Sequence, residues 1–463
     1  MTCKWMKDKI SLSQLTILIV STIASIRTLP TTAFFGSSLV FFYVLSAFLF
    51  LIPVAFISAE FSSRYPDEGG VFHWIGRAYG KKLGMLAVWL QWINTMVWYP
   101  TMLLFIGGTA SYLINPALAT NSVFLLTVSL LTFWGLTFLN LNGIRSSVRL
   151  NSFCGIAGTF IPLFVLLCLG IGWILASNPT EISCGWKDLI PSFGTMDGTN
   201  ALITIMASFV GMELAGVHIG DVVDPKKNFP KATAYSVLAL LGTFIFGSLV
   251  IALVVPNKEI HFVDGVMQTF TAFLTAFNLP YFIPWLALLI ILGAVGGSVN
   301  WVLSPAKGLL QAAEEGFLPN YFVEKNKKGV AYRILVLQAI AVSLFCYALF
   351  FVSNVNDYYW FLMALSTGLY MLMYILLFLA ALKLGRPEGD GVIPRGVRGI
   401  LCGLGLFSCL VTMILGFQPA PGIIIESQTS YIFTIAAGFL LLLFPVWFCW
   451  KWREKKGERV STQ

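Results

Sequence analysis

The chain alternates between long apolar blocks and short polar connections along nearly its whole length. Twelve blocks of about 20 residues or more carry few charges, and a helix of that length crosses a hydrocarbon core of about 30 Å. The predicted spans are 11–34, 38–59, 84–113, 121–140, 148–176, 198–218, 231–255, 283–312, 332–353, 357–381, 397–417 and 430–450. The pattern therefore predicts an all-α integral membrane protein with 12 transmembrane helices.

One further segment, 261–279, is amphipathic and too polar at its start to span the membrane. We expect it to form a surface helix at the outer side. The composition supports the membrane assignment, because 57% of the residues are hydrophobic and only 11% are charged. A soluble domain carries about 25% charged residues.

The basic residues lie almost entirely in alternate connections, and this bias predicts the orientation. With the N-terminus inside, 25 of the 29 Lys and Arg residues fall on inner segments, whereas only Lys187 and Lys258 fall on outer loops. Positive charge accumulates on the cytoplasmic side of membrane proteins. Both termini are therefore predicted to be cytoplasmic. The net charge of +8 does not indicate nucleic-acid binding, because the basic residues do not gather on one soluble face.

The spans fall into two groups of five with a similar rhythm, followed by a final pair. Each group opens with a span rich in Ser, Thr and Gly, which is the pattern that inverted repeats with interrupted helices leave in transporter sequences. We predict one transmembrane domain over 1–463, with halves at 1–177 and 198–382, helices 11 and 12 at 397–450, and a short cytoplasmic tail at 451–463.

Three ionisable residues stand inside predicted spans, where a charge is costly. Glu213 is flanked by Gly211 and Gly216, so an unwound segment there would expose backbone groups, and Glu213 could bind a substrate ammonium, hold a proton, or pin the segment structurally. Arg27 could contact an anionic substrate, pair with a carboxylate, or extend to the outer interface. Lys307, near the inner end of its span, is assigned a structural role.

Polar and aromatic side chains near these charges complete the candidate substrate site. Hydroxyl groups could line a break in the first span or bond ordinary helix carbonyls, and aromatic rings could wall a pocket or stack on an ammonium. The candidate substrate-binding residues are Ser21, Thr22, Ser25, Arg27, Trp98, Tyr99, Ser208, Phe209, Gly211, Glu213, Trp301 and Trp360.

Motifs for cofactor, metal or catalytic chemistry are missing from the sequence. The three histidines are scattered, the eight cysteines show no ligand spacing, and no phosphate loop or nucleophile elbow occurs. We expect no cofactor, no metal and no enzyme activity. A membrane-embedded enzyme would need clustered polar residues at one bilayer face. The first apolar block is full length, which argues against a cleaved signal peptide.

Several motifs together resemble the amino acid–polyamine–organocation permeases, and especially their bacterial glutamate/GABA antiporter branch. They occur in the same order and spacing over nearly the whole chain. The motifs are Leu39-Val40-Phe41-Phe42, Pro53-Val54-Ala55, Ala59-Glu60, Glu68-Gly69-Gly70-Val71-Phe72-His73-Trp74, Gly211-Met212-Glu213, Asp224-Pro225-Lys226-Lys227-Asn228-Phe229-Pro230, Gly265-Val266-Met267-Gln268-Thr269-Phe270, Ser304-Pro305-Ala306-Lys307-Gly308-Leu309 and Leu318-Pro319.

This resemblance implies a five-plus-five inverted-repeat (LeuT-like) fold with helices 1 and 6 broken at the site. It also implies alternating access and substrate exchange, with site residues in the stretch from Ser21 to Arg27 and at Gly211 and Glu213. Two departures matter. First, the usual Gly-Ser-Gly type of break in helix 1 is replaced by Ser and Thr. Second, the tail after helix 12 is shorter than the C-terminal segment that plugs the acid-resistance glutamate antiporter. A pH gate formed by such a plug is therefore not expected.

The resulting prediction is a secondary active transporter of amino acids or related amines in the inner (plasma) membrane, acting as an antiporter. Its partners are a small-molecule substrate and the lipid bilayer. Proton-coupled uptake is the main alternative, and a non-transporting membrane sensor on the same fold is a remote one. The sequence leaves open which amino acid is carried, whether protons are coupled, and the oligomeric state.

Overall fold

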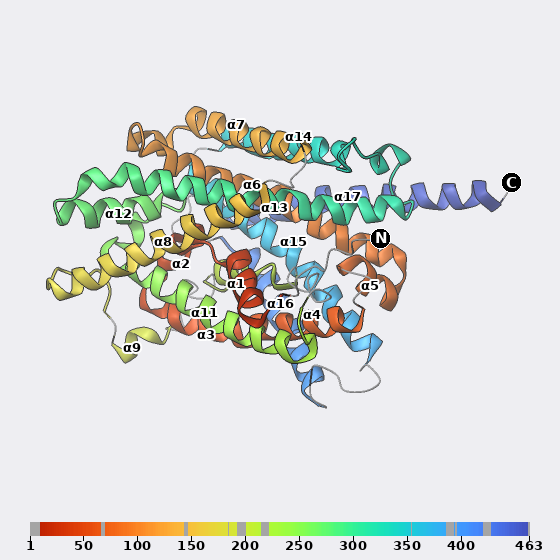
Figure 1. Cartoon of the computed structure of the whole chain (residues 1–463), viewed down its shortest axis with the longest axis horizontal. Coiled ribbons are helices and arrows are strands. Elements are labelled where there is room, and N and C mark those ends of the chain that lie inside the picture. Colours follow the sequence, from red (N-terminus) through yellow and green to blue (C-terminus); the bar gives the residue numbers. More distant parts are fainter. Residues whose placement is uncertain are drawn as a thin grey trace, which may run out of the picture.

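The computed structural model is built from helices throughout the part of the chain that it describes. That part comprises residues 10–65, 70–142, 147–183, 185–191, 201–213, 222–352, 354–385, 393, 396–419 and 427–461. The helices run side by side as a bundle (Figure 1). One end carries α5 (Val71–Tyr79) and the end of α17 (Gln428–Ser461), and we call it the inner end. The opposite, outer end carries α9 (Trp186–Leu189) and α12 (Gly265–Ala276).

Nine helical stretches in the described residues are long and apolar enough to cross a membrane. They match nine of the predicted spans with shifts of a few residues at their ends. The stretches are Gly36–Arg64, Ser122–Leu141 (α7), Ala157–Leu175 (within α8, Ser147–Leu175), Lys227–Val254 (within α11, Pro225–Val254), Pro280–Glu314 (with α13, Ile283–Glu314), Tyr332–Phe351 (with α14, Tyr332–Tyr347), Val355–Leu384 (α15), Val397–Gly416 (α16) and Gln428–Glu454 (within α17).

The other three predicted spans are more polar or less regular. The first is a pair of segments, Leu12–Ser21 and Ile26–Ala33, that meet at an angle of 41°. The third is the 31-residue α6 (Lys81–Ser111), whose Trp, Tyr, Asn and Gln side chains reduce its hydropathy. Of the sixth, the described part is α10 (Ala201–Phe209) and the four residues after it. The number 12 therefore stays a prediction.

Two connecting segments differ from the sequence prediction. Residues 71–79, taken there as part of an inner loop, form α5, because Gly70 and Gly80 adopt positive φ at its two ends and one face of the helix is apolar. The predicted surface helix at 261–279 is shorter, since α12 begins at Gly265. Half of its residues are buried, so it is an inserted helix rather than one lying wholly on the surface.

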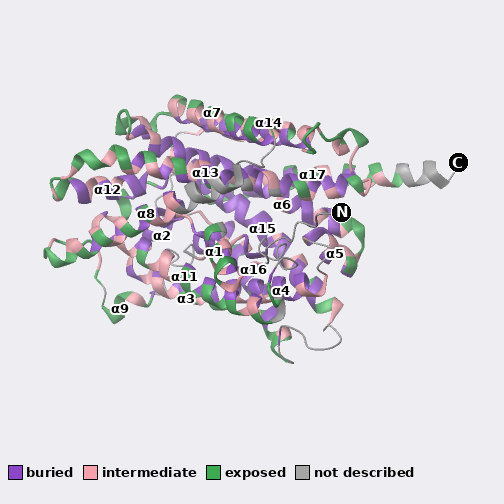
Figure 2. Ribbon diagram, in the orientation of Figure 1, coloured by how far each residue is buried: buried purple, intermediate pink, exposed green. Residues whose placement is uncertain are grey.

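The centre of the bundle holds α6 and α15, and these two helices and the outer segment of helix 1 (Ile26–Ala33) are buried over most of their length (Figure 2). Helices α7 and α14 lie along one side and expose apolar side chains, as expected for helices that face lipid. Helices α8 and α13 cross with backbone contact at Gly158 and Gly293. A Cβ atom on Gly158 would lie 2.2 Å from Cα of Gly293, so only glycine fits there.

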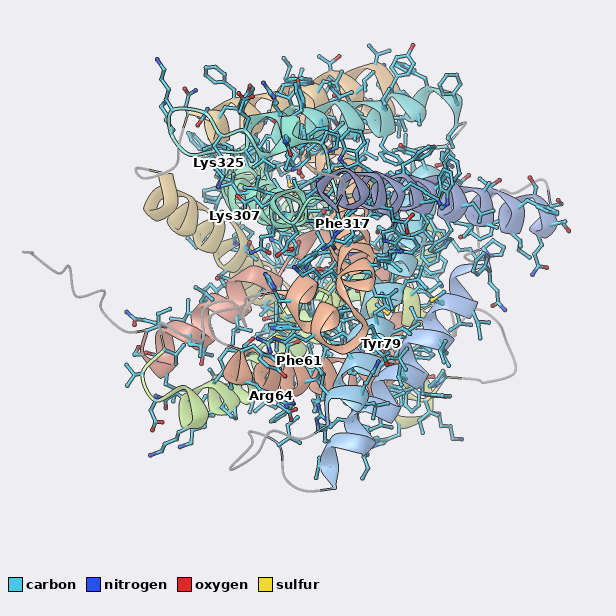
Figure 3. The ribbon with its side chains drawn as sticks, turned by 90° about the vertical axis from the view of Figure 1, so that its right-hand side faces the viewer. Phe61, Arg64, Tyr79, Lys307, Phe317 and Lys325 are labelled. Atoms are coloured by element: carbon cyan, nitrogen blue, oxygen red, sulfur yellow. The ribbon has the colours of Figure 1, made fainter. Side chains whose placement is uncertain are left out.

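The inner end is tied together by backbone-directed hydrogen bonds. The residue before α1 (Leu12–Ile23) pairs with the residues before α11, since the backbone N–H of Val223 donates to the carbonyl of Ile10 at 3.0 Å. Ser236 of α11 donates to the carbonyl of Thr16 at 3.3 Å. Arg64 caps the last carbonyls of α15, one of them Gly385 at 3.0 Å (Figure 3). These bonds fix α1 to α11, and Arg64 to the end of α15.

Candidate functional site

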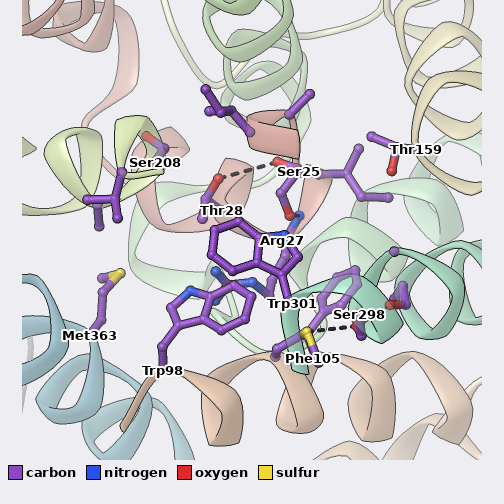
Figure 4. A pocket seen from close by; sticks show the side chains of 18 of the residues that line it. Ser25, Arg27, Thr28, Trp98, Phe105, Thr159, Ser208, Ser298, Trp301 and Met363 are labelled. Atoms are coloured by element: carbon purple, nitrogen blue, oxygen red, sulfur yellow. Dashed lines mark hydrogen bonds between the residues drawn. The ribbon is translucent and has the colours of Figure 1, made fainter. Parts of the chain in front are cut away.

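A cavity of about 150 Å³ lies inside the bundle, where helix 1 is interrupted. Figure 4 shows its side chains, which come from both sides of the helix 1 break and from α6, α8, α10, α13 and α15. Ser21, on the inner flank, is exposed, whereas Arg27 is 6% exposed. The lining includes Ser21, Ala24, Ser25, Arg27, Thr28, Asn94, Trp98, Phe105, Thr159, Ser208, Ser298, Trp301, Met363 and Tyr370.

Helix 1 is broken at Ala24 and Ser25, both of which have extended backbone conformations. Ser25 then caps the short helix η1 (Ile26–Thr28), because its hydroxyl accepts from the backbone N–H of Arg27 at 3.3 Å. The N-terminal end of a helix favours anions, and the C-terminal end of α1 favours cations. A break that presents both ends to one cavity suits a zwitterion.

Arg27 places its guanidinium at the cavity wall beside the break. Its Nη1 donates to Thr101 at 2.8 Å and to Tyr359 at 3.0 Å, and the group lies 4.9 Å from the ring centre of Trp98. Nε is buried without a hydrogen-bond partner. Within the described part of the chain no carboxylate lies within ion-pair distance of Arg27. The cavity therefore presents a positive charge that the described residues do not neutralise.

Two indole rings form one wall of the cavity. Trp98 of α6 and Trp301 of α13 lie with ring centres 5.4 Å apart. Tyr99 supports this wall from outside the cavity, since its hydroxyl donates to the carbonyl of Trp301 at 2.6 Å. Indole faces attract organic cations, so the wall can accept an ammonium group or the aliphatic part of a substrate.

Helix 6 is interrupted where the sequence pattern placed its break. Helix α10 ends at Phe209, and Gly211 adopts a φ of 104°, a conformation that favours glycine. The hydroxyl of Tyr374 accepts from the N–H of Gly211 at 3.1 Å. Gly216 lies outside the described residues.

Glu213 lies next to this break and is 2% exposed. Its carboxylate accepts hydrogen bonds from the hydroxyls of Tyr370 and Tyr374 and from Nε2 of Gln91, the last at 3.2 Å. Tyr370 lines the cavity and Glu213 does not. Glu213 therefore reaches the cavity through a tyrosine hydroxyl, and its contacts fasten the helix 6 break to α6 and α15.

The cavity contains about half of the residues predicted from the sequence. Its lining includes Ser21, Ser25, Arg27, Trp98, Ser208 and Trp301. Five others do not line it, because each contacts neighbouring helices instead: Tyr99, Phe209, Gly211, Glu213 and Trp360. Phe209 packs against Tyr43 and Phe244, and Trp360 is buried against Phe262, while Tyr99, Gly211 and Glu213 have the contacts given above. The side chain of Thr22 is outside the described set.

Four residues of the site were missed by the sequence argument. Thr101 and Tyr359 hold Arg27, Tyr370 links Glu213 to the cavity, and Gln91 bonds to both Tyr370 and Glu213. Each lies on an aromatic-rich or polar stretch of α6 or α15, both of which are mostly buried. Lys307 is exposed and has no hydrogen bond or ion pair within the described residues.

Two interrupted helices beside a small cavity that holds an arginine and several hydroxyl groups, within an apolar bundle, define a membrane carrier of the alternating-access kind. The chain belongs to the amino acid permease family, since the sequence profile of that family matches residues 10–442. An uncharacterized transporter of Legionella pneumophila is 35% identical over 99% of both chains. A glutamate/γ-aminobutyrate antiporter of Lactococcus lactis is 28% identical over 98% of this chain and 92% of its own.

A solved structure has the same fold. It is a manganese transporter of Eremococcus coleocola in complex with an aromatic bis-isothiourea compound, and it superposes with a TM-score of 0.60 over 99% of this chain and 97% of its own, at 12% identity. At that identity the similarity concerns the fold alone. The all-helical, LeuT-like architecture expected from the sequence is thereby confirmed.

Proposed function

We propose that the chain exchanges amino acids, or an amino acid and its amine product, by alternating access of the cavity at the helix breaks. The observation that carries this proposal is the unneutralised guanidinium of Arg27 beside a helix N-terminus in a zwitterion-sized cavity. The name of the Lactococcus relative, a glutamate/γ-aminobutyrate antiporter, supports exchange and an acidic substrate.

The groups around the cavity suggest how a substrate would lie. The α-carboxylate faces the N-terminal end of η1 at Ser25 and Ile26, and the ammonium faces the last carbonyls of α1 and the indoles of Trp98 and Trp301. A carboxylate in the side chain of the substrate would reach Arg27, whose Nε has no hydrogen-bond partner. Anions bound by a buried guanidinium gain charge-assisted hydrogen bonds that neutral substrates lack.

The wider arrangement that we propose follows the sequence prediction. The halves 1–177 and 198–382 form an inverted repeat around the cavity, and 397–450 and the tail 451–463 lie outside it. Both termini are cytoplasmic, as the positive charge of the inner connections favours. We also propose that the protein resides in the plasma membrane.

Counterflow tests this function directly. Purified protein in liposomes loaded with unlabelled glutamate or γ-aminobutyrate should accumulate labelled glutamate, and liposomes loaded with buffer should not. Ser25→Pro serves as an inactive control, because proline fixes φ at about −65°, whereas Ser25 has a φ of −142° and caps η1 with its hydroxyl. If uptake is the same in loaded and empty liposomes but vanishes when the proton gradient is dissipated, exchange is refuted.

Proton-coupled uptake is the second candidate function, and the buried position of Glu213 is the observation that favours it. A carboxylate held by two tyrosine hydroxyls and linked to the cavity by Tyr370 could take up a proton as substrate binds. In that case Glu213→Gln would keep counterflow and lose accumulation driven by a proton gradient. Under the exchange function, an imposed proton gradient drives no net accumulation by either protein when the liposomes contain no counter-substrate.

A further inference from the structure

The segment 260–264, which joins α11 to α12, covers the outer side of the site. Phe262 is the central residue of this cover and is 6% exposed. Its ring lies 6.1 Å from that of Phe34 in the outer part of helix 1, and 6.3 Å from those of both Tyr359 and Trp360 in α15. The backbone N–H of Phe262 donates to Asn356 at 3.1 Å. The segment thus connects two helices that border the cavity.

This cover contacts a residue that holds Arg27 in place. Tyr359, on which Phe262 packs, accepts a hydrogen bond from Arg27 at 3.0 Å. Tyr359 is fully buried, and the ring of Phe262 is one of the groups that cover it. Seating of the segment therefore closes the outer side and fixes Arg27 at the same time.

A polar cluster at the edge of the segment joins it to the end of α6 through Asp264. Nδ1 of His261 lies 3.1 Å from Oδ1 of Asp264, and the hydroxyl of Tyr112, at the end of α6, donates to Oδ2 of Asp264 at 2.8 Å. The Asp264 side chain is 5% exposed, whereas that of His261 is 46% exposed. Water from the outer side can thus reach His261 but hardly reaches the carboxylate that it contacts.

We propose that the segment 260–264 is a proton-stabilised lid, closed over the outer side of the site when His261 is protonated against Asp264. Asp264 is buried while the segment is closed, and a protonated His261 beside it supplies the opposite charge that offsets the cost of burying this carboxylate. Acid on the outer side then favours the outer-closed state of the transporter. The inference rests on the transport function proposed above, yet it concerns the gate and not the identity of the substrate.

The sign of the pH effect follows from the surroundings of His261. Its hydrogen bond to Asp264 raises the pKa of the imidazole, and the charges of Asp264 and Glu259 add to this, while partial burial opposes them. Tyr112 of α6 faces it through Asp264, and α15 contributes the amide of Asn356, next to Asp357. The stabilisation is therefore complete below about pH 6.5, the ordinary value for histidine, and is lost as the pH rises through the raised pKa.

A cysteine placed under the lid can report whether it is open. Thr109 is fully buried and shares a face of α6 with the cavity residue Phe105, four residues before it, and with Tyr112, three residues after it. Thr109→Cys is nearly isosteric, and its hydroxyl has no hydrogen-bond partner to lose. The background carries Cys168→Ser and Cys184→Ser, and a membrane-impermeant maleimide is added from outside to protein in vesicles without substrate.

The labelling rate is divided by that of Thr180→Cys, an exposed residue near α9, because thiol reactivity itself falls in acid. We expect this ratio to fall by about 2- to 5-fold from pH 7.5 to pH 5.5, the range of a partly exposed ion pair. In His261→Gln the ratio should stay at its high-pH value. Asp264→Asn should behave in the same way.

A ratio that does not change with pH in the parent, or that changes equally in His261→Gln, overturns the lid. If Thr109→Cys does not insert, the dependence of counterflow on outer pH is compared between the parent and His261→Gln, and equal dependence overturns the inference too. Since labelling needs no substrate, loss of counterflow with normal pH-dependent labelling would refute the proposed function and leave the lid intact.

Discussion

Replacing Arg27 with glutamine should weaken the binding of glutamate and change the stability of the fold very little. The guanidinium lies at the cavity, and its described partners are neutral, namely Thr101, Tyr359 and the ring of Trp98. A hydrogen bond to a charged group contributes about 1.5–3 kcal/mol. Because about 1.4 kcal/mol corresponds to a factor of ten, Arg27→Gln should raise the half-saturation concentration for glutamate about 10- to 150-fold.

The same substitution should cost little stability. The protein loses two hydrogen bonds from a charged group, each of which contributes about 1.5–3 kcal/mol, and one cation–π contact of about 1–2 kcal/mol. It also loses a buried charge, whose removal from water costs several kcal/mol when no opposite charge compensates it. Because the two effects nearly cancel, we expect the melting temperature of Arg27→Gln to lie close to that of the parent, as measured by thermal unfolding in detergent.

The assay compares glutamate with glutamine, which has the same shape and no side-chain charge. Initial rates of counterflow give a half-saturation concentration for each, and the parent should prefer glutamate whereas Arg27→Gln should not. Arg27→Lys is the matched control, since it keeps the charge and loses the planar donor fork, and its preference should be intermediate. An unchanged preference in Arg27→Gln, or a collapse of stability, would refute this account of the residue.

Three glycine and carboxylate substitutions test the rest of the site. Glu213→Gln turns one acceptor toward a tyrosine hydroxyl into a donor, so counterflow should slow about 10-fold with normal membrane insertion, and an unchanged rate would contradict the assignment. Gly211→Ala should cost about 1–3 kcal/mol of stability at a φ of 104° and impair transport, as thermal unfolding and counterflow can show. Gly158→Ala should lower the melting temperature, because its Cβ would lie 2.2 Å from Gly293, whereas Gly172→Ala on the same helix meets only an ordinary contact and should not.

The spans could be predicted because membrane crossing depends on a property that each segment carries by itself. About 20 apolar residues suffice, whatever the neighbours are. The errors fall where that property gives no information. Helix α5 is only nine residues long, and α11 begins at Pro225, in a polar stretch that hydropathy assigned to a loop.

The site could be predicted only in part, because its contacts join residues far apart in the chain. Glycine near Glu213 indicated the break in helix 6, and a buried arginine indicated a charge in the cavity. By contrast, nothing local to Tyr359 shows that it bonds to Arg27, 332 positions away. For the same reason, Phe209 and Trp360 were assigned to the cavity although their rings pack behind it.

The backbone pairing of Ile10 with the start of α11 limits how the inner side can move. A hinge at Ala24 and Ser25 would by itself allow the inner part of helix 1 to swing freely. The bonds from Val223 to Ile10 and from Ser236 to Thr16 instead make α1 and α11 one mechanical body. Opening toward the inner side then has fewer degrees of freedom than the number of helices suggests. A tag or truncation that disturbs the residues before α1 would therefore change the free energy of inner opening without touching the cavity.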